Sequence, residues 1–133
     1  MSGAFVDTGA WFACFCPRDV HHAEAAVRMR QLLTSGRLVT SDYVFSELVT
    51  LARKREGFHA ARRVGESLRA HGNLLIVEVT QDVRDLAWDF FLRHRDHDLS
   101  FTDCTSFALI REHRIPKVFT YDQDFRLTGR EIV

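Results

Sequence analysis

The apolar residues of this chain fall into short continuous runs that alternate with longer segments in which they recur at helical spacing. The short runs predict buried strands at 4–6, 38–40, 74–79 and 118–120, and a further strand is expected at 131–133. Helical spacing predicts helices at 8–15, 20–33, 43–54, 58–70, 81–92 and 100–113. This alternation predicts an α/β fold, a three-layer sandwich whose central parallel sheet of four to five strands is covered by helices.

Polar residues mark where several helices begin, and apolar residues mark the faces expected to point inward. Ser41 or Asp42 is placed to cap the helix after the second strand, and Thr80 or Gln81 opens the helix after the third strand. In the second helix the expected inward positions are Ala23, Val27 and Leu32. In the helix at 81–92 they are Val83, Leu86, Ala87, Phe90 and Phe91.

Length and composition are those of one globular domain spanning 1–133, with 46% hydrophobic residues and no low-complexity segment. The two tryptophans, Trp11 and Trp88, are expected to add mass to the core or to an interface. The net charge is zero, so the chain as a whole lacks the basic excess of many nucleic-acid binders. A local basic patch remains compatible with that total, because acidic residues elsewhere cancel it.

The amino-terminal apolar stretch has no basic segment before it and is interrupted by Asp7, which argues against a signal peptide and against a membrane span. The cysteines, Cys14, Cys16 and Cys104, are odd in number and form no CxxC pair. Reduced, buried thiols fit this pattern better than a disulfide framework does. We therefore expect a cytoplasmic protein that makes no contact with membranes.

Acidic residues stand where the predicted strands end and where the adjoining helices begin. Asp7 and Asp122 each follow a buried strand, and Glu47 and Asp103 each lie near the start of an amphipathic helix. In open α/β sheets, ligands bind in the crevice beyond the carboxyl ends of the strands. Carboxylates gathered at that edge would form an all-oxygen site of the kind that Mg²⁺ or Mn²⁺ prefers.

Local motifs around these acids occur in a fixed order along nearly the whole chain. They are VDTGAW at 6–11, SEL at 46–48, LSFTD at 99–103 and TYDQDF at 120–125. Any one of them is a weak signal, whereas the ordered set is strong. With these motifs the chain resembles the PIN-domain nucleases, and it looks most like the VapC-type toxins of toxin–antitoxin pairs. The resemblance implies a PIN-like version of the three-layer sandwich.

The resemblance also implies the site residues and the partners. The family's metal-binding acids carry over to Asp7, Glu47, Asp103 and Asp122, with Asp124 as a second candidate for the last position. The family often has Ser where this chain has Gly9, a departure that removes one hydrogen bond near the carboxylates. The implied activity is metal-dependent hydrolysis of RNA, leaving 5′-phosphate ends. The implied partners are a small antitoxin and a second copy of the chain.

Roles for these residues follow from what phosphodiester hydrolysis requires, namely an activated water and neutralised phosphate charge. Asp7 and Asp103 are expected to be the core ligands of the primary Mg²⁺ or Mn²⁺ ion. Glu47 binds that ion directly or through water, and Asp122 helps to hold a second ion or a ligated water. Hydrogen bonds to the acids are expected from neighbouring hydroxyl residues, Thr8, Ser100, Thr102 and Thr120.

Each acid also has a purely structural interpretation. Asp7 could cap the following helix, Asp103 could form a capping box with Ser100, Asp122 could be a turn residue, and Glu47 a solvated helix residue. A zinc site of Cys14 and Cys16 with the His21–His22 pair is a weak alternative, because the spacings match no usual zinc motif. Those structural roles do not predict that all of the acids fall at strand ends and helix starts.

Other functions remain to be weighed against a toxin nuclease. A catalytically silent PIN-like RNA-binding or scaffold module is one, and a PIN nuclease of RNA processing is another. A receiver domain or a dehalogenase-type phosphatase is disfavoured, because Asp7 has no acidic neighbour and residue 9 is Gly. The one notable basic cluster, which is either a solvated face or a contact for RNA phosphates, comprises Arg53, Lys54, Arg55, Arg62 and Arg63.

Overall fold

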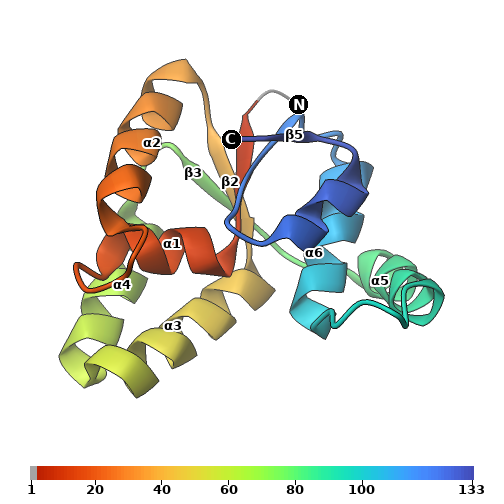
Figure 1. Cartoon of the computed structure of the whole chain (residues 1–133), viewed down its shortest axis with the longest axis horizontal. Coiled ribbons are helices and arrows are strands. Elements are labelled where there is room, and N and C mark those ends of the chain that lie inside the picture. The colour runs from red at the N-terminus through yellow and green to blue at the C-terminus, as the bar shows by residue number, and fades with distance from the viewer. Residues whose placement is uncertain (1–2) are drawn as a thin grey trace.

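A computed structural model describes residues 3–133, in which one sheet of parallel strands lies between two layers of helices (Figure 1). The strands are β1 (Ala4–Val6), β2 (Leu38–Ser41), β3 (Leu74–Val77), β4 (Lys117–Phe119) and β5 (Glu131–Ile132). Their order across the sheet is β3-β2-β1-β4-β5, and every neighbouring pair is parallel. This architecture confirms the predicted α/β sandwich.

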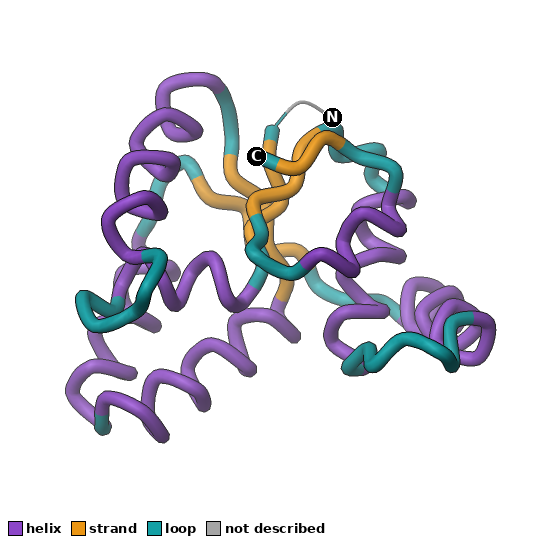
Figure 2. Tube along the Cα trace, viewed as in Figure 1, coloured by secondary structure: helices purple, strands orange, loops and turns teal. Residues whose placement is uncertain are grey.

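Helices follow the strands in the predicted alternation. They are α1 (Thr8–Phe15), α2 (His22–Ser35), α3 (Asp42–Glu56), α4 (Phe58–Ala70), α5 (Gln81–Arg93) and α6 (Phe101–Glu112), with a 3₁₀ helix, η1 (Gln123–Thr128), after β4. Helices α1 to α4 lie on one side of the sheet, and α5, α6 and η1 lie on the other (Figures 1 and 2). The sequence did not predict η1, because a single 3₁₀ segment is too short to show a hydrophobic period.

The core is built on the central strand β1, whose Phe5 and Val6 are fully buried. On the α6 side, Phe107 and Phe125 meet edge to face with ring centroids 4.7 Å apart, and both are fully buried. Strand β3, at the edge of the sheet, is only half-buried along its length. The strand that was predicted at 74–79 ends at Val77, because its partner β2 ends at Ser41, the residue that pairs with Val77.

Two of the predicted inward faces are partly wrong. Helix α2 buries Ala25 and Leu32, whereas Ala23 and Val27 are exposed. Helix α5 buries the spaced positions 83, 87 and 90, which form a single narrow stripe. Leu86 and Phe91 flank that stripe and are 47% and 38% exposed.

The two tryptophans have different environments. Trp11 is buried, and its Nε1 donates to Thr40 Oγ1 at 3.2 Å, which ties α1 to the sheet. Trp88 is 53% exposed and stacks on Phe91 on the outer face of α5, so it is no part of the core. Within residues 3–133, no helix has both the length and the apolar character that a membrane crossing requires.

Topology determines where the candidate acids lie. Because β1 pairs with β2 on one side and with β4 on the other, all in parallel, the carboxyl ends of these strands share one edge. Asp7 leaves β1 at this edge, α3 begins there after β2, and Thr120 follows β4. Residues from distant parts of the sequence therefore meet at one end of the sheet.

Candidate active site

Asp7 is the most deeply buried of the acids. It follows β1 and caps α1, with its Oδ1 accepting from the Thr8 backbone N–H at 2.7 Å. Its Oδ2 accepts from the Thr120 hydroxyl at 3.0 Å, a contact across the sheet. Burial, and then the negative charges of Asp103 and Asp122, raise the pKa of Asp7 to about 7 despite these hydrogen bonds. At neutral pH this carboxyl is poised between its protonated and ionised forms.

Asp103 lies in the first turn of α6 and faces the same region. Its backbone N–H donates to Ser100 Oγ at 3.0 Å, and its Oδ2 accepts from the Ser100 backbone N–H at 3.3 Å, which completes a capping box. Burial raises the pKa of Asp103 to about 6, and the charges of Asp122 and Glu47 add to the effect against the Ser100 hydrogen bonds. Asp103 is thus electrostatically linked to Asp7, Glu47 and Asp122.

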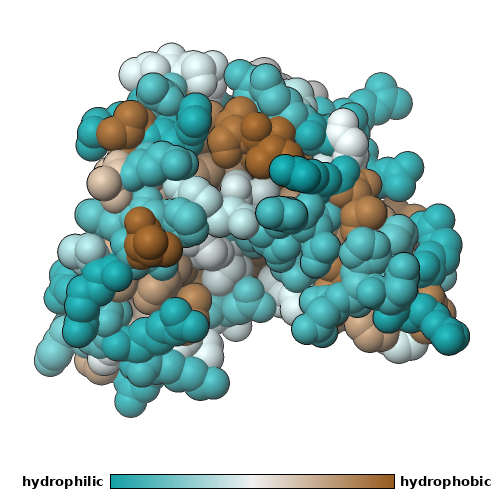
Figure 3. All heavy atoms as spheres, viewed as in Figure 1, coloured by the Kyte–Doolittle hydropathy of each residue, from teal (hydrophilic) through white to brown (hydrophobic). Residues whose placement is uncertain are grey.

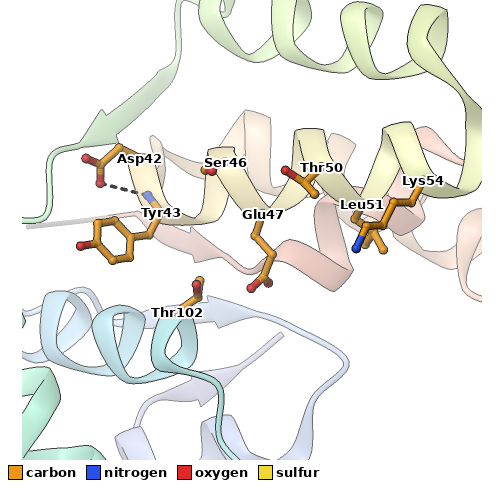
Figure 4. A pocket seen from close by; sticks show the side chains of 8 residues that line it. All are labelled: Asp42, Tyr43, Ser46, Glu47, Thr50, Leu51, Lys54 and Thr102. Carbon is orange, nitrogen blue, oxygen red and sulfur yellow. Dashed lines mark hydrogen bonds between the residues drawn. The ribbon is translucent and has the colours of Figure 1, made fainter.

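Glu47 lies on α3, and its carboxylate points across a gap towards the start of α6, where Thr102 lies (Figure 4). Together they line an open hollow of about 670 Å³. In the space-filling view the outline is notched between the α3 and α6 sides (Figure 3). Lys54, which belongs to the predicted basic cluster, also lines this hollow. Tyr43 and Thr50, on the same face of α3, were not among the predicted site residues. Their helical spacing relative to Glu47 was the signal that could have found them.

Asp122 and Asp124 differ in their surroundings. Asp122 caps η1, its Oδ1 accepting from the Asp124 backbone N–H at 2.9 Å. Its charge raises the pKa of both Asp7 and Asp103. Asp124 instead has its Oδ1 3.3 Å from Nδ1 of His97, a contact that the sequence did not indicate. Asp122 is therefore the better candidate for the fourth acid, and its contribution to a metal site stays a prediction.

The structural interpretations of these acids hold alongside the electrostatic coupling. Asp7, Asp103 and Asp122 all cap helices through one carboxylate oxygen, as the local sequence suggested. A capping bond fixes the rotation of a short side chain and leaves its second oxygen available. For Asp7 the second oxygen is held by Thr120, whose hydroxyl also accepts from the Asp122 backbone N–H at 3.0 Å. The caps thus orient the acids and do not exclude a further, chemical role.

The side chains around Asp7 and Asp103 offer oxygen donors to a metal ion. Among residues 3–133, no three acidic, histidine or cysteine side chains are arranged as a ready-made cage around one ion. The charges of the neighbouring acids nevertheless help to raise the pKa values of Asp7 and Asp103, and all of the donors are oxygen. The hydroxyl of Thr8, next to Asp7, is buried without a hydrogen-bond partner in the described part of the chain. This chemistry fits a hard divalent cation, with side-chain adjustment needed for direct ligation.

The residues of the zinc alternative have other partners. Burial raises the pKa of the Cys14 thiol to about 12, and the Cys16 thiol lies 3.3 Å from Glu56 Oε1. His21 stacks on Tyr121, and Nδ1 of His22 lies 2.8 Å from the Ala13 carbonyl oxygen. A thiol with a raised pKa is a poor metal ligand, because the thiolate is the form that binds.

Replacing Thr120 by Val tests the hydroxyl that joins Asp7 to the Asp122 backbone. The variant should lose about 1–3 kcal/mol of stability, because the buried Asp7 carboxylate and the partly buried Asp122 backbone N–H both lose a partner. The pKa of Asp7 should rise above about 7, since the lost hydrogen bond favoured the ionised form. Chemical denaturation and NMR titration measure both effects, and Thr120→Ser should restore them. An unchanged Asp7 titration in Thr120→Val would contradict this role.

Comparison with known proteins identifies the family. The PIN-domain family model matches residues 4–131, which is nearly all of the chain. The chain belongs to the PIN-domain family. This PIN domain is 33% identical over 127 residues to the 23S rRNA-specific endonuclease VapC20 of Mycobacterium tuberculosis, covering 94% of this chain and 93% of that protein. A VapC ribonuclease of Archaeoglobus fulgidus is 27% identical over 93% of this chain and 80% of its own length.

Solved structures agree with that assignment. The PIN domain superposes on crystalline M. tuberculosis VapC20, a toxin that cleaves the sarcin–ricin loop, with a TM-score of 0.85, 32% identity and 96% coverage of both chains. It also shares the fold of VapBC2 from Rickettsia felis bound to a promoter DNA fragment, with a TM-score of 0.75 at 11% identity, covering 100% of this chain and 98% of that one.

Proposed function

We propose that this PIN domain is a metal-dependent endoribonuclease whose site is formed by Asp7, Glu47, Asp103 and Asp122. The observation that carries the proposal is that Asp103 is electrostatically linked to Asp7, Glu47 and Asp122, although the four acids come from separate segments of the chain. In a silent RNA-binding or scaffold module Asp7 would serve only as the cap of α1, and an uncharged Ser or Asn could cap that helix without burying a carboxylate beside like charges. Similarity to two named VapC nucleases supports the same conclusion.

The acids would hold Mg²⁺ or Mn²⁺, which accept the same oxygen ligands. When bound, such an ion neutralises phosphate charge and lowers the pKa of its water. Asp7 and Asp103 are the proposed core ligands, because they are the two acids whose pKa values are raised by burial and by the charges of the other acids. Glu47 is the residue proposed to orient the attacking water, since its carboxylate points into the open hollow where a substrate enters.

The biological setting proposed for the chain is that of a cytoplasmic toxin held in check by a small antitoxin. Solved relatives include VapBC complexes from Rickettsia felis and Salmonella typhimurium, which support a protein partner. We propose ribosomal RNA as the first substrate to test, because the M. tuberculosis relative is named for 23S rRNA. A homodimer and a single PIN-like domain over 1–133 complete the proposal, and sedimentation of the purified chain measures the assembly.

Cleavage assays test the proposed function directly. Purified protein is incubated with intact ribosomes, naked 23S rRNA and a mixed RNA pool, each with Mg²⁺, Mn²⁺ or EDTA. The expected result is cleavage that needs metal and is lost in Glu47→Gln. The downstream fragment should carry a 5′-phosphate, so a ligase should join it to an adaptor without prior phosphorylation. Cleavage that persists in EDTA would contradict a carboxylate metal site. Cleavage of the pool but not of ribosomal RNA would support the nuclease function and contradict ribosomal RNA as the substrate.

A further inference from the structure

A second hollow lies between α3 and α4, apart from the acids. It has a volume of about 320 Å³. Its apolar lining comes from Phe45, Val49, Phe58, Ala61 and Gly65, and its charged lining from Arg53, Arg62, Glu66 and Arg69. We refer to these nine residues as the α3–α4 groove. Neither the capping bonds nor the acid cluster described above involves any of them.

The groove combines positive charge with an exposed aromatic face. Phe58 is 55% exposed, and the Arg53 guanidinium lies over its ring, 5.3 Å from the ring centroid. Glu66 is paired with Arg62 at 2.8 Å, which leaves the charge of Arg53 and Arg69 unbalanced within the groove. The Arg53 guanidinium shows that the ring accepts a flat partner on that face, and a base that stacks there takes the place of Arg53. Positive charge beside a partly exposed aromatic ring is the chemistry that binds single-stranded nucleic acid.

Helix α3 connects this groove to the candidate active site. The residues at 45, 49 and 53 face the groove, whereas those at 43, 47, 50 and 54 face the hollow beside α6. Arg53 and Lys54 are neighbours in sequence, and Arg53 lines the groove whereas Lys54 lines the hollow beside α6. Positive charge is therefore present in both hollows. Glu47 and Arg53 are separated by about 9 Å along the helix axis, from the rise of an α-helix. A strand bound at Glu47 reaches the groove within a few nucleotides.

We infer that the α3–α4 groove binds a single-stranded segment of the RNA substrate next to the cleaved bond, an inference that rests on the proposed nuclease function. An unpaired base stacks on Phe58, and Arg53 moves from the ring to a flanking phosphate. Arg69 contacts a second phosphate at the rim. Base stacking does not depend strongly on sequence, so the groove sets affinity and strand register rather than the identity of the cleaved site.

Binding measurements on the metal-free protein separate this groove from the chemistry. Wild-type protein in EDTA is titrated into a fluorescent single-stranded RNA and into a blunt RNA duplex at several salt concentrations. Phe58→Ala should weaken single-strand binding about tenfold, the usual cost of losing one stacked base. Arg69→Ala should weaken binding and reduce the salt slope by about one. Neither change should reduce the melting temperature, because both side chains are exposed.

Matched controls lie on the opposite side of the molecule. Phe91→Ala removes a partly exposed aromatic ring from α5, and Arg95→Ala removes an exposed charge after α5. Both should bind RNA as wild type does. In one outcome, wild type cleaves RNA with metal while Phe58→Ala and Arg69→Ala bind and cleave as wild type does. That result would contradict RNA binding by the α3–α4 groove and would still support the nuclease function. If wild type neither binds nor cleaves any RNA, the proposed function itself fails.

A protein occupant of the groove gives a different result. If a second copy of the chain covers the groove, Phe58→Ala changes the sedimentation coefficient of the metal-free protein and leaves RNA affinity intact. That outcome would overturn the RNA assignment. The inference is supported when Phe58→Ala lowers RNA affinity at an unchanged sedimentation coefficient, and when the loss is larger for the single strand than for the duplex.

Discussion

Asp103→Asn is expected to abolish RNA cleavage while leaving the metal-free protein as stable as wild type or more stable. Burial raises the pKa of Asp103 to about 6, so keeping this carboxyl ionised at neutral pH costs more free energy in the folded protein than in the unfolded chain. The Asn side chain keeps an oxygen that can accept from the Ser100 backbone N–H, and therefore the capping box loses little. Loss of even an outer partner of a metal site costs about 10–100-fold, so loss of a proposed ligand should exceed that.

The cleavage activity and the metal-free stability of Asp103→Asn are measured separately. Cleavage is followed with Mg²⁺ and with Mn²⁺, and thermal unfolding is followed in EDTA. Asp98→Asn is the matched control, because Asp98 is exposed in the loop before α6 and should leave both quantities unchanged. A clear drop in the metal-free melting temperature of Asp103→Asn would mark Asp103 as mainly structural. Cleavage by Asp103→Asn at the wild-type rate would remove it from the site.

The metal-free protein should lose stability relative to Asp7→Asn as the pH rises from about 5 to about 8, by an amount on the order of 3 kcal/mol. The ordinary pKa of this carboxyl is 3.8, and in the folded protein burial raises it to about 7. Between these values the folded state binds a proton that the unfolded state has released, so each increase in pH favours unfolding. Below 3.8 both states are protonated and the contribution of Asp7 is fully present. Above about 7 it is lost.

Urea unfolding of wild type and of Asp7→Asn in EDTA, from pH 5 to pH 8, measures this difference and cancels the contribution of titrating groups that do not interact with Asp7. Adding Mg²⁺ or Mn²⁺ should stabilise wild type more at pH 8 than at pH 5, because the ionised carboxylate is the form that binds. Asp7→Asn should gain little from metal at either pH. Parallel stability profiles for the two proteins would show that Asp7 titrates normally and would remove the basis for a coupled acid site.

Much of this protein is determined locally in the sequence. The helix predicted at 58–70 is found as α4, and the predicted caps Ser41, Thr80 and Ser100 all accept backbone hydrogen bonds at the start of their helices. A capping bond joins residues only a few positions apart, so its partners are visible in the sequence. The same locality explains why the sequence alone assigns the acids to strand ends and helix starts.

Tertiary structure decided what depends on distant residues. The hydrogen bond from Thr120 to Asp7 spans 113 positions and exists because β4 pairs with β1. The raised pKa values follow from that arrangement, since burial and the approach of separate acids come from packing. Exposure of Leu86 and Phe91 was likewise invisible in the sequence, because periodicity gives a helix an apolar face without giving the width of the surface that covers it. The sequence by itself therefore identified the candidate acids. Strand pairing and helix packing, which join distant parts of the chain, bring them to the same end of the sheet.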